Sequence, residues 1–145
     1  TEAEWEFAAR GGNLSKGYEY AGSKNLNEVG WFWENSGDKP LSGDWDYEKK
    51  IKPNNCRTHP VGQKKANELD IYDMSGNVWE WCQDWYGDYP TGAQTNPQGP
   101  DSGSYRVLRG GSWYDGPQGC RVAVRGYDAP GGRGTVAGFR LARTF

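Results

Sequence analysis

The residues of this sequence best suited to metal or nucleophilic chemistry are three cysteines and one histidine, because thiolates and imidazoles bind soft and borderline metals. The cysteines are Cys56, Cys82 and Cys120, and no two of them form a CxxC pair. Their odd number allows at most one disulfide within the chain, and the sequence leaves open whether it forms. The single histidine, His59, excludes a site built from several histidines, and its THPVG context is typical of a loop.

A second group that could do chemistry combines large rings with carboxylates in the segment WEWCQDWYGDY. The rings are Trp79, Trp81, Trp85 and Tyr86, and the carboxylates are Asp84 and Asp88. Rings can stack on sugars, and a pair of carboxylates can hydrolyse a glycosidic bond. Large rings more often pack in a protein core, and core packing is the use favoured here.

The composition limits the scaffold that could position these residues. The chain has 145 residues, enough for one domain, and 22 of them are glycine. Eight tryptophans and nine tyrosines argue against disorder, while the glycine content argues against a helix bundle. A formal net charge of −2 without a basic stripe makes nucleic acid an unexpected partner. No apolar run approaches the roughly 20 residues of a membrane span.

The pattern predicts one clear helix, over residues 1–10. Thr1 and Glu4 fit a capping box, and Trp5, Ala8 and Ala9 share one face. Residues 13–68 are irregular and rich in turn formers, a stretch that is normally functional or held by specific contacts.

Short strands are expected in the second half of the chain. They are predicted within RVLRGGSW (106–113), where a short strand ends at the Gly pair, and at CRVAVR (120–125) and GFRLARTF (138–145). Val122 and Val124 would share one face of the second strand, and Phe139, Leu141 and Arg143 one side of the third. The expected fold class is α+β, with short antiparallel strands, few helices and much ordered loop.

Five blocks together resemble the formylglycine-generating enzyme (sulfatase-modifying factor) family. In chain order they are TEAEWEFAARGG, NELDIYDMSGNVWEWCQDWY, RVLRGGSW, CRVAVR and GFRLAR. The resemblance implies a C-type lectin-like fold in which residues 1–145 form the C-terminal part of one larger domain. Residues 38–57 would be an insertion. Family members have further residues upstream, and a strand that pairs with GFRLAR is expected there.

The resemblance also bears on the two metals of the family. Catalytic members hold Cu(I) with two cysteines after the Gly-Gly-Ser block, and here only Cys120 follows it, so we expect no copper and no enzyme. A structural calcium ion is implied at Asp73 and Glu80 with the carbonyls of Gly76 and Val78. Alternatively, Asp73 caps a turn and Glu80 pairs with an arginine such as Arg106 or Arg109.

The stretch from Tyr114 to Ala137 contains no Lys, Glu, Met or Trp and a single Gln. These are the residue types that an AAC codon cannot reach through changes of its adenines. Within its flanking blocks, the stretch resembles the variable region (here 106–143) of diversity-generating retroelement proteins, most closely that of Treponema. The resemblance implies these candidate variable residues: Tyr114, Asp115, Gly116, Gly119, Val124, Gly126, Tyr127, Asp128, Ala129, Gly131, Gly132, Gly134, Thr135, Val136 and Ala137. The invariant frame between them would be Cys120, Arg121, Val122, Ala123, Arg125, Pro130 and Arg133. A glycine-rich loop that happens to lack these types is the alternative.

The expected function is therefore a ligand-binding receptor whose variable surface is diversified by mutagenic reverse transcription. Tyr114 and Tyr127 are the expected contact residues, because tyrosine offers a large rigid area at low entropic cost. The ligand is expected to be a protein on another cell or host, with no nucleic acid and no membrane contact by this stretch. The resemblance implies display at the cell surface, with a lipid anchor upstream. The alternatives are a family homologue with lost or unknown catalytic activity and a calcium-dependent lectin.

Overall fold

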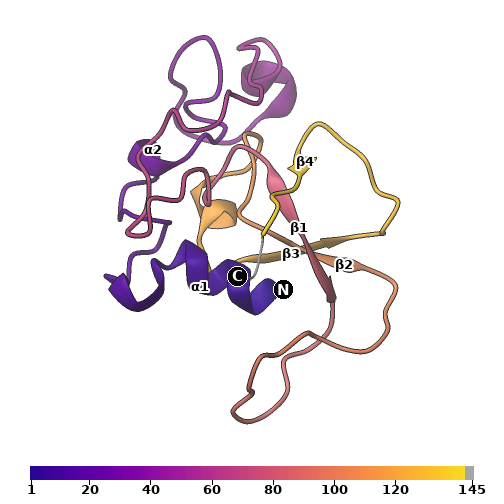
Figure 1. The fold of residues 1–145 in the computed structure, drawn as a ribbon. Helices are drawn as coiled ribbons and strands as arrows, with labels where there is room; N and C mark the ends of the chain where they lie inside the picture. Colours follow the sequence, from indigo (N-terminus) through magenta and orange to yellow (C-terminus); the bar gives the residue numbers. More distant parts are fainter. Residues whose placement is uncertain (143–145) are drawn as a thin grey trace.

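The computed structural model describes residues 1–142 and has a four-stranded sheet with one helix packed on it (Figure 1). The elements are α1 (Glu2–Ala9), η1 (Gly12–Leu14), α2 (Leu26–Val29), η2 (Tyr47–Ile51), β1 (Trp79–Trp85), β2 (Arg106–Arg109), η3 (Pro117–Cys120), β3 (Arg125–Asp128) and β4 (Ala137–Gly138). The strand order is β3-β2-β1-β4. The β1–β2 and β2–β3 pairs are antiparallel as predicted, whereas β4 runs parallel to β1. Within residues 1–142, no helix combines the length and the apolar character needed to cross a membrane.

Helix α1 forms as predicted because its first turn is closed by local contacts. The Glu4 amide donates to the Thr1 hydroxyl, and the Glu4 carboxylate accepts from the Thr1 nitrogen, so the capping box is complete. Trp5 and Ala9 are buried on the face toward the sheet, and the Trp5 indole donates to Glu80 at 2.6 Å. The sequence alone therefore predicts this helix, and tertiary contacts fix its position on the sheet.

Strand β1 has two different faces, because successive side chains of a strand alternate. Cys82 packs in the core with Trp5, and Asp84 accepts from the first turn of α1, so this face lies toward the helix. Trp79, Trp81 and Trp85 occupy the other face and are half-buried.

Two predicted strands are wrong in extent. The strand expected at residues 120–125 begins only at Arg125, because Cys120 ends η3 and the Val122 amide donates to the Glu19 carbonyl instead of a ladder partner. Val122 is buried in a loop. Of the strand expected over 138–145, the described residues form only Ala137–Gly138, and residues 139–142 are exposed and outside any strand. Arg143 lies outside the described residues.

The irregular stretch 13–68 is held by specific side-chain contacts, as expected for so long a loop. Asn67 donates to the Ala8 carbonyl and accepts from the Ile71 amide, which ties the stretch to α1. Asn54 exchanges two hydrogen bonds with the backbone of Lys39. That residues 38–57 are an insertion stays a prediction.

Candidate functional site

Two tryptophans gather separate segments of the predicted variable stretch on one surface. The Trp79 indole donates to Asp115 at 2.9 Å, and its amide donates to the Val136 carbonyl at 2.8 Å. The Trp113 indole donates to the Thr135 carbonyl at 2.9 Å. Gly126 lies against the Trp79 ring, so closely that a Cβ there would be 3.0 Å from Cζ3. We call the following candidate variable residues the recognition surface: Tyr114, Asp115, Gly116, Gly119, Gly126, Thr135, Val136 and Ala137.

The exposure of the candidate variable residues differs from that of the frame between them. None of the candidates is buried, whereas Cys120 and Val122 of the frame are. The exposed candidates are Tyr127, Asp128, Ala129, Gly131, Gly134 and Thr135. The half-buried candidates are Tyr114, Asp115, Gly116, Gly119, Val124, Gly126, Gly132, Val136 and Ala137. The frame is not uniformly internal, because Ala123, Pro130 and Arg133 are exposed.

Asp115 differs from the other candidates because its carboxylate is engaged inside the chain. One carboxylate oxygen accepts from the Ser112 amide at 2.9 Å, from the Ser112 hydroxyl and from the Trp79 indole. These three contacts hold the turn that follows β2 against β1. Asp115 thus has a positioning role that the sequence did not indicate.

The two tyrosines expected to make contacts lie apart. Tyr127 projects on the face of β3 opposite to Gly126, where it packs against Tyr86 and Tyr105 with ring centroids 4.4 Å and 5.1 Å away. It remains 53% exposed. Tyr127 is therefore accessible but belongs to a second cluster, separate from Tyr114 on the recognition surface.

Tyr114 has aromatic neighbours that sequence reasoning missed, Trp45 and Tyr47 of the 38–57 segment. Trp45 meets the Tyr114 ring edge-on at 5.0 Å, and its indole donates to the Tyr114 carbonyl at 2.9 Å. Trp45 and Tyr47 are 46% and 40% exposed. In the sequence, two aromatic residues within a loop otherwise rich in Lys, Asp and Gly could have indicated a contact surface.

The residues predicted to hold calcium are close in sequence, and the structure engages Glu80 and one carboxylate oxygen of Asp73, while the other Asp73 oxygen is buried without a hydrogen-bond partner among residues 1–142. Both oxygens of Glu80 accept from Arg140 at 2.7 Å, and Trp5 donates to one of them. Asp73 accepts from the Gly62 amide at 2.7 Å. In the described part of the chain, no three His, Cys, Asp or Glu side chains cluster as a metal site. The charge of Glu80 is balanced by Arg140, so a calcium ion bound there would have to compete with this arginine. Arg140, not Arg106 or Arg109, is the arginine that pairs with Glu80. Calcium at Asp73, Gly76, Val78 and Glu80 stays a prediction.

The three thiols are free among the described residues, and two of them are buried. Burial raises the pKa of Cys82 to about 12, and burial also raises the pKa of Cys120, with Asp115 adding to the effect. Since the thiolate is the metal-binding and nucleophilic form, both side chains are poor ligands and poor nucleophiles at neutral pH.

This arrangement predicts the reactivity of the three thiols. At pH 8 the native protein should react with Ellman's reagent at the half-exposed Cys56, while Cys82 and Cys120 react only after denaturation. Because folding raises the pKa of Cys82, its protonated form persists to about pH 12 in the native state. Mass spectrometry of the labelled peptides distinguishes the sites. Rapid native labelling of Cys120 would contradict the prediction.

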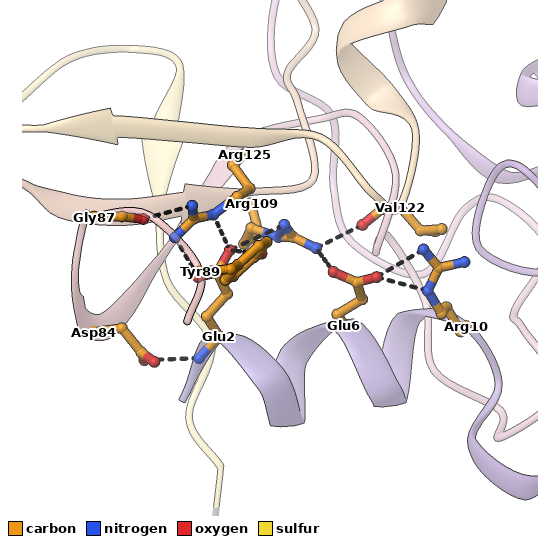
Figure 2. Close-up of polar contacts among 9 residues, drawn as sticks. All are labelled: Glu2, Glu6, Arg10, Asp84, Gly87, Tyr89, Arg109, Val122 and Arg125. Carbon is orange, nitrogen blue, oxygen red and sulfur yellow. Dashed lines mark hydrogen bonds and ion pairs between the residues drawn. The ribbon is translucent and has the colours of Figure 1, made fainter. Parts of the chain in front are cut away.

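A buried ion-pair network joins α1 to the sheet (Figure 2). Arg109 on β2 is 0% exposed and donates to Glu2 at 3.1 Å, to Glu6 and to the Val122 carbonyl. Arg125 on β3 also donates to both oxygens of Glu2, at 2.7 Å and 2.8 Å. The network holds Arg125, a frame residue, opposite Arg109 of β2. It therefore supports the observed pairing of β3 with β2, and this pairing decides which face of β3 each candidate variable residue occupies.

Comparison with known proteins shows similarity along nearly the whole chain. A chaperone protein LppX of Paenibacillus barcinonensis is 43% identical over 144 residues, which cover 99% of this chain and 48% of that protein. A formylglycine-generating enzyme of Streptomyces coelicolor is 36% identical over 151 residues, 98% of this chain and 45% of the enzyme. Treponema denticola variable protein 1 superimposes with a TM-score of 0.77 at 39% identity, over 96% of this chain and 44% of that one. The chain thus spans about half the length of these relatives.

The mixed sheet, the few helices and the ordered loops define a C-type lectin-like α+β scaffold, as predicted. The sulfatase-modifying factor enzyme 1-like domain model matches residues 1–145. The chain belongs to this family, so the resemblance found in the sequence is confirmed. The family includes formylglycine-generating enzymes, and one structural neighbour is a variable protein.

Proposed function

We propose that this chain is a ligand-binding domain, not an enzyme, and that its candidate variable residues bind the ligand. The observation that carries the proposal is that no candidate variable residue is buried, whereas two of the seven frame residues, Cys120 and Val122, are part of the core. A receptor that changes its surface must keep its core, and this alternation allows both. The similarity to Treponema denticola variable protein 1 supports the proposal.

The proposed mechanism is complementarity of shape and hydrogen bonding on a rigid frame. Tyr114, with Trp45 and Tyr47 beside it, would supply aromatic contact area. The proposed ligand is a protein on another cell or host, and the proposed location is the cell surface or outside it, with a lipid anchor upstream. Neither nucleic acid nor membrane contact by this stretch is part of the proposal.

Retroelement diversification is the finer part of the proposal, and the genome tests it. We expect a near-identical repeat of the 106–143 coding stretch, with AAC codons at the candidate positions, close to a reverse transcriptase gene. Its absence would overturn the diversification and leave an ordinary glycine-rich loop.

Local packing predicts which glycines among the candidate variable residues tolerate side chains, and it sets Gly126 apart from Gly131 and Gly134. Gly131→Tyr and Gly134→Tyr should change the free energy of unfolding by about 0.5 kcal/mol or less, because nothing lies within 4 Å of a Cβ at either position. Gly126→Ala should cost about 1–3 kcal/mol, because the new methyl group meets the Trp79 ring. Urea unfolding followed by tryptophan fluorescence measures all three. Large losses for both tyrosine variants would contradict a variable loop.

The alternative is a family homologue with lost or unknown catalysis, which the similarity to formylglycine-generating enzymes favours. We expect a sulfatase-motif peptide incubated with the protein, Cu(I) and oxygen to keep its cysteine. Conversion of that cysteine to formylglycine, seen by mass spectrometry, would favour the enzyme and contradict the proposal.

A further inference from the structure

A cavity of about 630 Å³ lies between α1 and the loop that leads from β1 to β2. The loop extends away from the sheet at the bottom of Figure 1. The apolar walls of the cavity are Ala3 and Phe7 from α1 and Pro90, Pro97 and Pro100 from the loop. This volume is in the range of small-molecule sites, which are mostly apolar with a few placed polar groups.

Most charged groups in the cavity wall are already balanced. The carboxylate of Glu2 accepts from Arg109, from two guanidinium nitrogens of Arg125 and from the Tyr89 hydroxyl at 3.0 Å (Figure 2). Burial and the neighbouring Glu2 raise the pKa of Tyr89, so that its hydroxyl remains a donor. Glu6 accepts from Arg10 and Arg109. The charges of Glu2 and Glu6 are therefore already paired within the protein, and these two carboxylates are poor partners for a charged ligand.

Asp84 and Asp88 are the exceptions. Asp84 lines the cavity and is only 3% exposed, yet among residues 1–142 it has one hydrogen bond, from the Glu2 amide at 2.7 Å, and no ion pair. Asp88 also lines the cavity and, within the same residues, has neither an ion pair nor a side-chain hydrogen bond. A buried carboxylate without a cation is costly, so a cationic group entering the cavity would gain from pairing with Asp84.

We propose that the α1 cavity, lined by α1, Asp84 of β1 and residues 87–100, binds a small apolar molecule that carries one ammonium group. The apolar body packs on Phe7 and the prolines, and the ammonium group donates to Asp84 and Asp88. The cavity contains none of the candidate variable residues, so this site would be common to all variants of the surface. The inference goes beyond the proposed receptor function and does not depend on it.

The test compares 2-phenylethylamine with 2-phenylethanol, which has the same body but no charge. Calorimetric titration should give at least about tenfold tighter binding of the amine, since a hydrogen bond to a charged group exceeds a neutral one. Backbone amide shifts in NMR spectra should concentrate at α1 and residues 87–100. Absence of binding by both compounds, equal affinities, or shifts centred elsewhere would overturn the proposal.

Three variants separate the charge from the apolar wall. Asp84→Asn should remove most of the preference for the amine while leaving the affinity for the alcohol, because the asparagine oxygen can still accept from the Glu2 amide. Asp88 is exposed, so Asp88→Asn should leave the folding of the core unchanged. This variant should reduce the preference for the amine in part. Phe7→Ala should lower the binding affinities of the amine and the alcohol by similar factors. An amine preference that persists in both asparagine variants would overturn the assignment of the anchors.

Discussion

Glu2→Gln is expected to lower the free energy of unfolding by about 3–5 kcal/mol, the range for removing one partner of a buried ion pair. Glu2 is buried and accepts from two arginines, of which Arg109 is fully buried. Neutralising Glu2 leaves Arg109 with the Glu6 carboxylate and the Val122 carbonyl, and it removes the carboxylate that pairs with Arg125. Guanidinium unfolding monitored by tryptophan fluorescence measures the loss.

The matched control is Glu4→Gln, the same change two residues further along α1. The Glu4 side chain is 72% exposed and glutamine also serves in a capping box, so we expect a change of about 0.5 kcal/mol or less. Similar losses in both variants would show that the effect comes from the helix and not from the network. A loss below about 1 kcal/mol for Glu2→Gln would contradict a structural role for the buried charges.

Gly76→Ala is expected to cost about 3 kcal/mol or more, from two effects that act together. Gly76 has a φ of +78°, a conformation that costs an L-residue roughly 1–2 kcal/mol. A Cβ there would also lie 2.3 Å from the Trp31 carbonyl oxygen, a backbone atom that cannot turn away, and overpacking adds about 1–3 kcal/mol. Thermal unfolding by circular dichroism measures the loss.

Gly17→Ala separates these two effects. Gly17 has a φ of +68° but nothing within 4 Å of its Cβ position, so only the strain of about 1–2 kcal/mol remains. Equal losses in the two variants would show that close approach to Trp31 is unimportant. The larger loss at Gly76 would mean that packing already requires a glycine at this position of the predicted calcium motif, whether or not calcium binds.

The family and the fold class were predictable from the sequence because they depend on local features and on many agreeing blocks. The capping box of α1 joins residues three apart, and such contacts form whatever the rest of the chain does. The compositional bias of residues 114–137 is also a property of the sequence alone. The exposure of its candidates agrees with that bias, although the diversification itself stays a proposal.

The extents of β3 and β4 were not predictable, because a strand is defined by the segment it pairs with. Residues 120–125 alternate as a strand should, but β2 pairs with residues 125–128, where Arg125 can reach Glu2. A shift of one residue reverses the face of every side chain. Only the observed pairing of β3 with β2 shows which face of β3 carries Tyr127 and which carries Gly126.

The sequence by itself determined the scaffold, the absence of a paired-cysteine motif and the positions of the candidate variable residues. The tertiary structure decided how they are combined: Trp79 and Trp113 gather the recognition surface, Arg140 balances Glu80, and Asp84 faces a cavity. Each of these contacts joins residues more than twenty positions apart in the chain. Sequence patterns report neighbours within a turn or a strand, whereas such long-range contacts exist only after the chain has closed its loops and buried its core.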